Sequence, residues 1–110
     1  MAKSRPDVPE ATLDLLVFRV LDRRGSLRGS EIASHIEETA GQLSVEEGAL
    51  YRTLHRMEKS GWIDAEWKLT ENHRRARSYS ITDSGKQRYK DERRKWRTLT
   101  ASVERVLRSG

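Results

Sequence analysis

The spacing of apolar residues along the chain predicts four amphipathic helices. Apolar side chains recur every three or four positions over residues 10–24, 30–40, 44–60 and 83–107, so each stretch carries them on one helical face. As a helix, residues 83–107 would span roughly 37 Å, which is longer than a compact domain of this size needs. We therefore expect the last helix to project toward a partner.

Short polar residues mark the expected start of three of these helices. Ser30 is suited to cap the second helix. Ser44 and Glu47 have the spacing of a capping box, in which each side chain accepts a hydrogen bond from a backbone N–H group near the other. Thr82 and Asp83 precede the last helix, where an acidic side chain also suits the positive end of the helix dipole.

Over residues 63–69 the period of the pattern changes to two, which is typical of a strand covered on one face. Residues 77–81 are expected to form the return strand of a two-stranded ribbon, and the polar residues 70–76 its protruding loop. Trp62 and Trp67 are interpreted as the residues that anchor this ribbon on the core.

The order of these elements predicts a mainly α fold, a winged helix-turn-helix with a two-stranded β wing and a long C-terminal helix. A chain of 110 residues fits one domain. Residues 1–9 contain both prolines and few apolar side chains, so we expect a flexible N-terminal arm. Residues 10–82 form the expected winged helix-turn-helix domain, and residues 83–110 the expected dimerisation helix.

Composition and charge narrow the choice of partner. Hydrophobic residues make up 35% of the chain and charged residues another 35%, so one subunit has a thin core and a second could supply further burial. The net charge of +5 is concentrated in residues 44–110 and favours nucleic acid or an anionic membrane surface. The longest apolar run, residues 15–18, is too short for a membrane span or a signal peptide. We expect a soluble, cytoplasmic protein without membrane contact.

Catalytic and metal chemistry find no support in the sequence. The chain has no cysteine, its 3 histidines lack the spacing of metal ligands, and no glycine-rich phosphate loop or nucleophile motif is present. We therefore expect neither an enzyme nor a cofactor or metal site.

The third helix and the loop of the ribbon carry basic side chains at the two places where a winged helix-turn-helix meets DNA. In the helix, the spacing places these side chains opposite the apolar face. A solvated surface is the alternative interpretation, and Arg77 could instead pair with Glu66 across the ribbon. The predicted partner is double-stranded DNA, and the predicted contact residues are Ser44, Tyr51, Arg52, Thr53, His55, Arg56, Lys59, Arg74, Arg75 and Arg77.

Apolar residues at heptad spacing in the last helix predict a short seam like that of a coiled coil. Together with the first helix, this seam is expected to form the interface of a homodimer. The predicted interface residues are Leu13, Leu16, Val17, Val20, Tyr89, Trp96, Leu99, Val103 and Val106.

Several segments taken together resemble the PadR family of bacterial transcriptional regulators, in its short form with a single C-terminal helix. The resemblance covers nearly the whole chain, although each segment alone is a weak signal. It implies a dimeric winged helix-turn-helix that binds an operator, commonly as a repressor, and that releases the DNA when an effector binds. The segments that carry it are residues 12–16, 46–51, 54–58, 61–63, 74–79 and 82–85.

The resemblance also gives Trp96 two interpretations. Some family members bind flat aromatic compounds between their subunits near such a helix, so Trp96 could contact a small aromatic effector. We favour a packing role, because an aromatic residue at heptad spacing ordinarily belongs to an interface core.

Three positions depart from the family pattern. Many members have an aromatic residue at Ser30, a proline at Arg52 and a tyrosine at Ser80. Arg52 adds charge to the surface expected to face the DNA groove, so the operator sequence cannot be transferred from relatives.

The alternative function is a winged-helix module that binds proteins or RNA without an operator, since this fold hosts such functions too.

Overall fold

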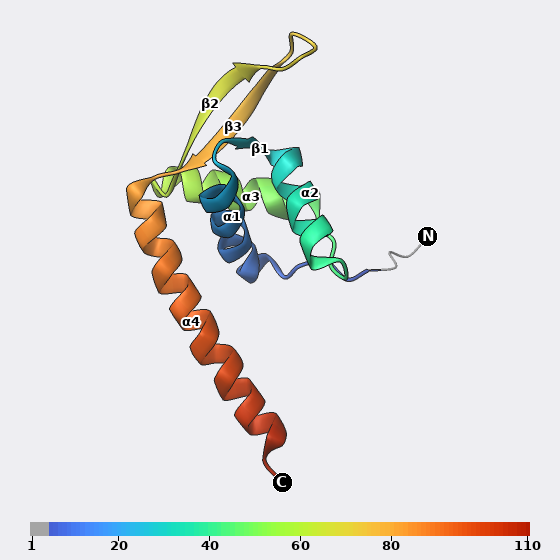
Figure 1. The fold of residues 1–110 in the computed structure, drawn as a ribbon, viewed down its shortest axis with the longest axis vertical. Helices are drawn as coiled ribbons and strands as arrows, with labels where there is room; N and C mark the ends of the chain where they lie inside the picture. The colour runs from blue at the N-terminus through green and yellow to red at the C-terminus, as the bar shows by residue number, and fades with distance from the viewer. Residues whose placement is uncertain (1–4) are drawn as a thin grey trace.

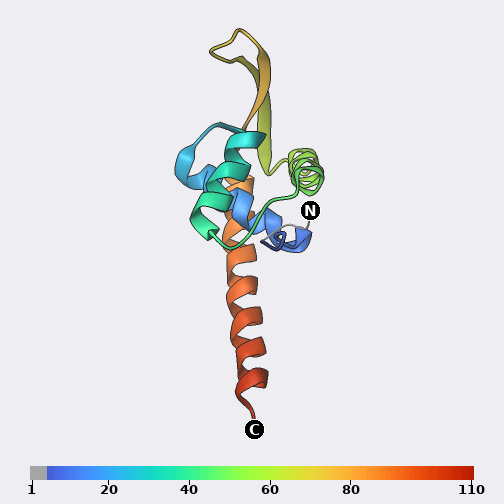
Figure 2. The same ribbon diagram turned by 90° about the vertical axis from the view of Figure 1, so that its right-hand side faces the viewer.

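The computed structural model describes residues 5–110 and is built mainly from α-helices (Figure 1). A central body contains the helices α1 (Glu10–Arg24), α2 (Gly29–Ala40) and α3 (Glu47–Lys59). The wing extends from one end of this body, and α4 (Asp83–Arg108) extends away from it in the other direction. Figure 2 shows that α4 continues as a straight rod well beyond the body. The winged helix-turn-helix predicted from the sequence is confirmed.

The wing consists of β2 (Ile63–Leu69) and β3 (Arg75–Ile81), which pair in antiparallel fashion along their whole length. A third strand, β1 (Leu27–Arg28), pairs with the other edge of β3, so that the strand order is β1-β3-β2. This strand was not predicted from the sequence, because two residues are too few to show a period. This short strand ties the connection between α1 and α2 to the base of the wing.

One apolar core joins the body, the base of the wing and the start of α4. The fully buried ring of Phe18 lies at its centre, with ring centroids of Trp62 at 6.0 Å and of Tyr89 at 5.9 Å. Burial of this kind is the main favourable term in folding. The buried apolar residues are Val8, Leu13, Val17, Phe18, Leu21, Ile32, Ile36, Ala49, Leu50, Leu54, Met57, Ile63, Tyr79 and Tyr89.

The described part of the predicted N-terminal arm lies against the body. Val8 is buried, and its backbone N–H donates to the carbonyl oxygen of Ser44 at 2.8 Å. The N–H of Ser44 in turn donates to the carbonyl of Pro6 at 2.9 Å. The expectation of a free arm is therefore corrected for residues 5–9, because one apolar side chain and a short ladder of backbone bonds hold them. Residues 1–4 of that prediction lie outside the described residues.

Two of the predicted helix starts are wrong. Helix α2 begins at Gly29, and Ser30 lies inside its first turn, where the backbone N–H of Arg28 donates to Glu31 at 2.8 Å. Helix α3 begins at Glu47, so the capping box that would have started at Ser44 does not form. The third prediction is confirmed, since the Thr82 hydroxyl accepts from the backbone N–H of Gly85 at the start of α4.

A close contact between backbones sets the direction in which α4 leaves the wing. The N–H of Thr82 donates to the carbonyl of Trp62 at 3.1 Å, and its hydroxyl donates to the carbonyl of Gly61 at 2.7 Å. A Cβ atom at Gly85 would lie only 2.0 Å from the Trp62 carbonyl oxygen. Only glycine fits at this position, because a backbone carbonyl cannot move aside as a side chain can.

Thr53 is buried in the body although the sequence analysis counted it among the residues that contact DNA. Its side chain is 0% exposed, because position 53 falls on the apolar side of α3 between Leu50 and Leu54. The described residues offer its hydroxyl no hydrogen-bond partner. Thr53 is therefore a core residue that carries an unsatisfied polar group.

We expect Gly85→Ala to lower the free energy of unfolding by about 1–3 kcal/mol, because the added methyl group meets the Trp62 carbonyl. Gly48→Ala in α3 is the matched control, since its Cβ would meet only the flexible side chains of Glu46 and Arg52. The control should unfold at an unchanged or higher urea concentration. Urea titrations followed by circular dichroism compare them, and equal midpoints would show that the contact at Gly85 is no constraint.

We expect Thr53→Val to raise the free energy of unfolding by about 1 kcal/mol, because valine keeps the shape and removes the unsatisfied hydroxyl. Thr12→Val is the control, since the Thr12 hydroxyl donates to the carbonyl of Pro9 at 2.8 Å and its loss should destabilise. The same urea titrations measure both variants. A loss of stability in Thr53→Val would mean that the hydroxyl has a partner after all.

Candidate nucleic-acid interface

Helix α3 has one buried side and one exposed side. Its buried residues pack on the core, and the exposed residues Tyr51, Arg52, His55 and Lys59 form the surface that we call the outer face. His55 and Lys59 make no ion pair among residues 5–110. The outer face therefore presents positive charge and hydrogen-bond donors to solvent along most of the helix.

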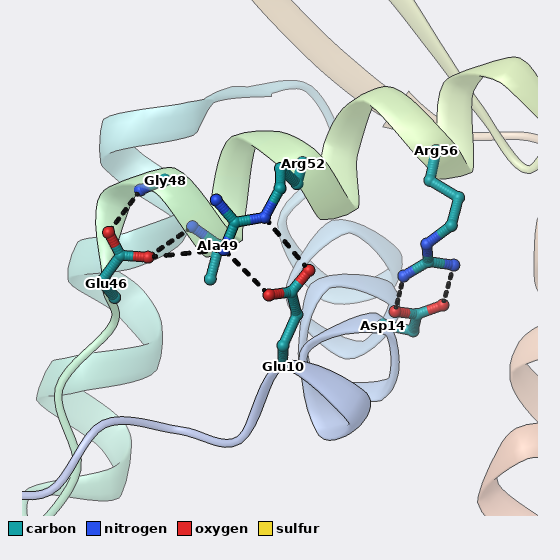
Figure 3. Close-up of polar contacts among 7 residues, drawn as sticks. All are labelled: Glu10, Asp14, Glu46, Gly48, Ala49, Arg52 and Arg56. Atoms are coloured by element: carbon teal, nitrogen blue, oxygen red, sulfur yellow. Dashed lines mark hydrogen bonds and ion pairs between the residues drawn. The ribbon is translucent and has the colours of Figure 1, made fainter.

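Glu46 determines where α3 begins (Figure 3). Its carboxylate accepts hydrogen bonds from the backbone N–H groups of Gly48 at 3.1 Å and Ala49 at 2.6 Å. A carboxylate with two oxygens can satisfy two free N–H groups at once, and its charge suits the positive end of the helix dipole. This explains why the helix starts at Glu47 and not at the predicted serine.

Ser44 lies before the helix and faces the N-terminal segment. Its hydroxyl donates to the Asp7 carboxylate at 2.9 Å, and the two residues form an isolated parallel bridge. The side chain is half-buried. Ser44 therefore holds the segment before α1 in place, and the structure does not bring it to the outer face with the other predicted DNA contacts.

Arg52 is paired with Glu10, the first residue of α1 (Figure 3). Its Nε and Nη2 atoms donate to the two carboxylate oxygens at 3.4 and 2.9 Å. Hydrogen bonding to Arg52 lowers the pKa of Glu10, and the same contact raises the pKa of Arg52. The side chains of both residues are largely exposed, so solvent and salt screen the pair.

Arg56 is paired with Asp14, one helical turn further along α1 (Figure 3). Both terminal nitrogens of its guanidinium donate to the carboxylate, one of them at 2.8 Å. This hydrogen bonding raises the pKa of Arg56, and the Asp14 side chain is only 17% exposed. Arg56 therefore lies on the flank of α3 that faces α1, beside the outer face and not at its centre.

Glu10 and Asp14 were not predicted as partners of the arginines, although the sequence holds a signal for them. Two carboxylates four residues apart in α1 meet two arginines four residues apart in α3, so that each pair lies one helical turn from the other. Equal spacing on two amphipathic helices is compatible with such a ladder of ion pairs. It cannot identify the partners, because the rotation of one helix against the other is set by the core.

The exposed half of the wing carries an aromatic residue between two arginines. Trp67 is 54% exposed, which corrects its interpretation as a core anchor. The guanidinium carbons of Arg75 and Arg77 lie 5.0 and 5.4 Å from the centre of its ring. Cations at these distances are attracted to the electron-rich face of the indole. The ring thus supports the two cations on one face of the wing.

Arg77 also links the wing to α3. Its guanidinium pairs with Glu58 at 2.6 Å. The alternative expected from the sequence, a pair with Glu66 across the ribbon, does not form. The strand register explains the difference: Arg77 lies opposite Trp67, whereas Glu66 lies opposite Ser78. Residues that are neighbours along a strand point to opposite faces of the sheet, so Glu66 is on the wrong face. Arg77 is half-buried and holds the wing against the helix.

Arg74 and Arg75 lie at the tip of the wing. The turn closes through the backbone N–H of Thr70, which donates to the carbonyl of Arg74 at 2.8 Å. Both arginines are exposed, and neither makes an ion pair within residues 5–110. They are therefore available to an anionic partner.

Tyr51 fixes the contact between the two helices of the helix-turn-helix. A Cβ atom at Gly29 would come within 2.7 Å of the Tyr51 hydroxyl oxygen, so the glycine at the start of α2 leaves room for this ring. The Tyr51 side chain is 43% exposed. Its hydroxyl thus lies at the edge of the outer face, beside the first turn of α2.

Apolar residues beyond the body form a stripe on α4. Trp96, Leu99, Val103 and Val106 remain exposed, by 42 to 71%. We call these four residues the α4 stripe. They are the distal part of the predicted interface, and in one subunit residues 5–110 leave a large part of each side chain uncovered.

Three of the predicted interface residues belong to the core of the subunit. Leu13 and Val17 are 0% exposed, and Tyr89 packs on Phe18 with 8% of its surface exposed. They are corrected to core residues, because a fully buried side chain has no surface to offer a partner. Leu16 and Val20 are half-buried on α1 and keep some exposed surface.

Trp96 borders an open groove between α1 and α4. The groove has a volume of about 290 Å³. Its wall on the α1 side contains Ala11, Thr12 and Leu15, and Glu92 and Lys95 lie beside the indole on α4. The surroundings of the ring are thus apolar on one side and charged on the other.

Residues 5–110 contain no group of three or more histidine, aspartate or glutamate side chains placed to hold a metal ion. None of the helices in this part of the chain is long and apolar enough to cross a membrane.

Solved structures with the same fold include several transcriptional regulators. A PadR family regulator from Eggerthella lenta is 23% identical, with a TM-score of 0.79 over 91% of this chain and 85% of that chain. A transcriptional regulator from Clostridium thermocellum is 27% identical, with a TM-score of 0.77 over 86% of this chain and 89% of that one. No curated protein sequence matches the chain.

PadR from Bacillus subtilis, solved in complex with operator DNA, is 30% identical. Its TM-score is 0.66, and the match covers 76% of this chain and 47% of that chain. The family model described as the Transcriptional regulator PadR-like family matches residues 17–91, which include α2, α3, the wing and the first turns of α4. Its members are transcriptional regulators and not enzymes. The chain belongs to the PadR-like family of transcriptional regulators.

Proposed function

We propose that the protein binds double-stranded DNA of a defined sequence as a homodimer and represses transcription from that site. The observation that carries this proposal is the arrangement of basic side chains that make no ion pair within residues 5–110: His55 and Lys59 on the outer face, and Arg74 and Arg75 on the wing. The ion pair between Arg77 and Glu58 holds these two surfaces together. A helix flanked by a basic wing suits a DNA groove with phosphates beside it.

The outer face of α3 is the part that would distinguish one sequence from another. An exposed helix fits the major groove of B-DNA, where each base pair shows a different pattern of donors and acceptors. Arg52 can donate two hydrogen bonds to a guanine edge, and Tyr51 and His55 offer shorter polar contacts. Family members commonly have proline at Arg52, so this residue would set the operator of this protein apart.

The wing would contribute affinity with little sequence preference. Arg74 and Arg75 are exposed and make no ion pair within residues 5–110, so they can approach phosphates without breaking an ion pair. Contacts of this kind release counterions and make binding depend steeply on salt. Arg77 is already paired with Glu58 and would mainly keep the wing in position.

The α4 stripe supports a homodimer. Four apolar residues at heptad spacing lie exposed on a helix that projects beyond the body (Figure 1). Covering them with the same stripe of a second copy would remove this apolar surface from water. A two-fold dimer would place two α3 helices about 34 Å apart, which suits two half-sites of a pseudo-palindromic operator.

The complex of the Bacillus subtilis relative with operator DNA supports the choice of partner. A regulator of this kind works in the cytoplasm, where the chromosome lies. A flat aromatic compound that stacks on Trp96 in the groove between α1 and α4 would be placed at the dimer interface and could relieve repression.

We expect Arg52→Ala and Arg75→Ala to weaken DNA binding in different ways. Loss of Arg52 should weaken the free energy of binding to the operator by about 1–3 kcal/mol and reduce the sequence preference at one base pair. Loss of Arg75 should weaken binding to all sequences equally and reduce the salt slope by about one. Fluorescence anisotropy with DNA from the protein's own promoter region and with random DNA, at several salt concentrations, measures both effects.

Lys90→Ala is the matched control, because it removes one exposed cation from α4, outside both α3 and the wing. This variant should change the sequence preference less than Arg52→Ala does, and the salt slope less than Arg75→Ala does. Equal binding of the unaltered protein to promoter and random DNA would overturn the proposal. Preferred binding to RNA would instead support a different winged-helix function.

We expect Leu99→Asp to convert the dimer to a folded monomer, because Leu99 is 56% exposed in one subunit and lies in the middle of the α4 stripe. A carboxylate buried at the interface would lack a partner. Ala101→Asp is the control, since it adds the same charge on the exposed surface of α4 outside the stripe. Sedimentation velocity gives the mass of each variant, and dimers of both would exclude the α4 stripe as the interface.

A further inference from the structure

Two carboxylates lie beside Arg52, an arginine expected to contact bases. Glu10 accepts two hydrogen bonds from its guanidinium, whereas Glu46 lies 3.9 Å from Nη2 and caps α3. We propose that Glu10 is a positioning residue for DNA recognition. Through its contact with Arg52, it makes this arginine prefer a base edge with two adjacent acceptors to an isolated phosphate. The inference rests on the proposed function. It concerns α1, an element outside the helix-turn-helix that would otherwise serve only the core and the dimer.

The contact with Glu10 leaves one end of the guanidinium free of hydrogen bonds. Glu10 accepts from Nε at 3.4 Å and from Nη2 at 2.9 Å, which uses the side edge of the group (Figure 3). A guanidinium has five N–H donors in a fixed plane. At the end formed by Nη1 and Nη2, the N–H groups of Nη1 and one of Nη2 make no hydrogen bond among residues 5–110, although Nη2 also lies 3.9 Å from a carboxylate oxygen of Glu46. One such N–H group on each nitrogen forms a pair that matches the O6 and N7 acceptors of guanine.

The position of Arg52 along the helix suits this role. Its Nη1 atom lies over Gly48, where a Cβ atom would come within 3.2 Å of it. The guanidinium is thus directed back toward the first turn of α3, the end of a recognition helix that contacts base edges. The missing side chain at Gly48 leaves space for the guanidinium, and the carboxylate of Glu10 holds it there.

The charge of Glu10 disfavours a movement of Arg52 from Glu10 to an isolated phosphate. Hydrogen bonding to Arg52 lowers the pKa of Glu10, so the carboxylate is ionised at neutral pH. If Arg52 swung away to a phosphate, one anionic partner would replace another, and an uncompensated carboxylate would remain close to the negatively charged DNA. Donation to a base edge from the free end avoids this cost, because the contact with Glu10 is kept.

The neighbouring cations lack such a carboxylate. Lys59 on α3 and Arg75 on the wing make no ion pair within residues 5–110 and can bind any phosphate. Arg56 has a carboxylate partner, but Asp14 is only 17% exposed and the pair lies between two packed helices. Among the basic residues of α3, Arg52 therefore combines a carboxylate partner with a largely exposed position on the outer face.

The test compares Glu10→Gln with Glu47→Gln. Both variants remove one exposed negative charge beside α3, and Glu47 has no ion-pair partner among the described residues. Removing a negative charge should strengthen binding to all DNA through long-range attraction. For Glu10→Gln we expect a further effect: the ratio of operator affinity to random-DNA affinity falls on the order of tenfold. For Glu47→Gln the ratio should stay the same.

Dissociation constants for a promoter fragment and for random DNA of equal length, at one salt concentration, give this ratio. In the Arg52→Ala background, Glu10→Gln should leave the ratio unchanged, because the arginine that it positions is gone. Circular dichroism should show unaltered folding, since the pair is exposed.

Equal changes of the ratio in the two glutamine variants would overturn the inference. So would an effect of Glu10→Gln that persists without Arg52. Failure of the unaltered protein to prefer the promoter fragment would be a different result, because it would overturn the proposed function on which the inference rests.

Discussion

The placement of the wing and of α4 depends on the buried ring of Phe18. This one side chain of α1 touches Trp62 at the base of the wing and Tyr89 in the second turn of α4. The backbone contact between Gly85 and the Trp62 carbonyl then fixes the angle between the two elements. A chain with few apolar residues thus uses a small core to orient two long projections.

Local patterns in the sequence predicted the elements well, and tertiary contacts explain where they failed. The bounds of α1 and the Thr82 cap of α4 follow from the residues themselves. The start of α3 was wrong, because Ser44 and Glu46 are both able to cap a helix and the N-terminal segment engages the serine. Trp67 fitted the alternation of a buried strand, yet the wing extends beyond the body, so the apolar core does not cover it.

The candidate site was predictable in its chemistry more than in its geometry. Basic residues on α3 and the wing were recognised from charge and spacing, and most of them are exposed. Thr53 was misplaced by a small error in the rotation of the helix, since its position borders the apolar side. The carboxylates of α1 were missed, because a sequence does not show which of two helical faces will meet. Their contacts hold both arginines of α3, whereas Lys59 of the same helix makes no ion pair within residues 5–110.

The length of α4 has a consequence for folding. Beyond Glu92 nearly every residue of this helix is exposed, and the remaining four turns rely on backbone hydrogen bonds and surface ion pairs such as Arg108 with Glu104. A helical segment of this length is only marginally stable in water without packing. Association of two subunits would therefore also complete the secondary structure of each one. The helical content of the protein would then rise with its concentration, and dilution would fray α4 from its C-terminus.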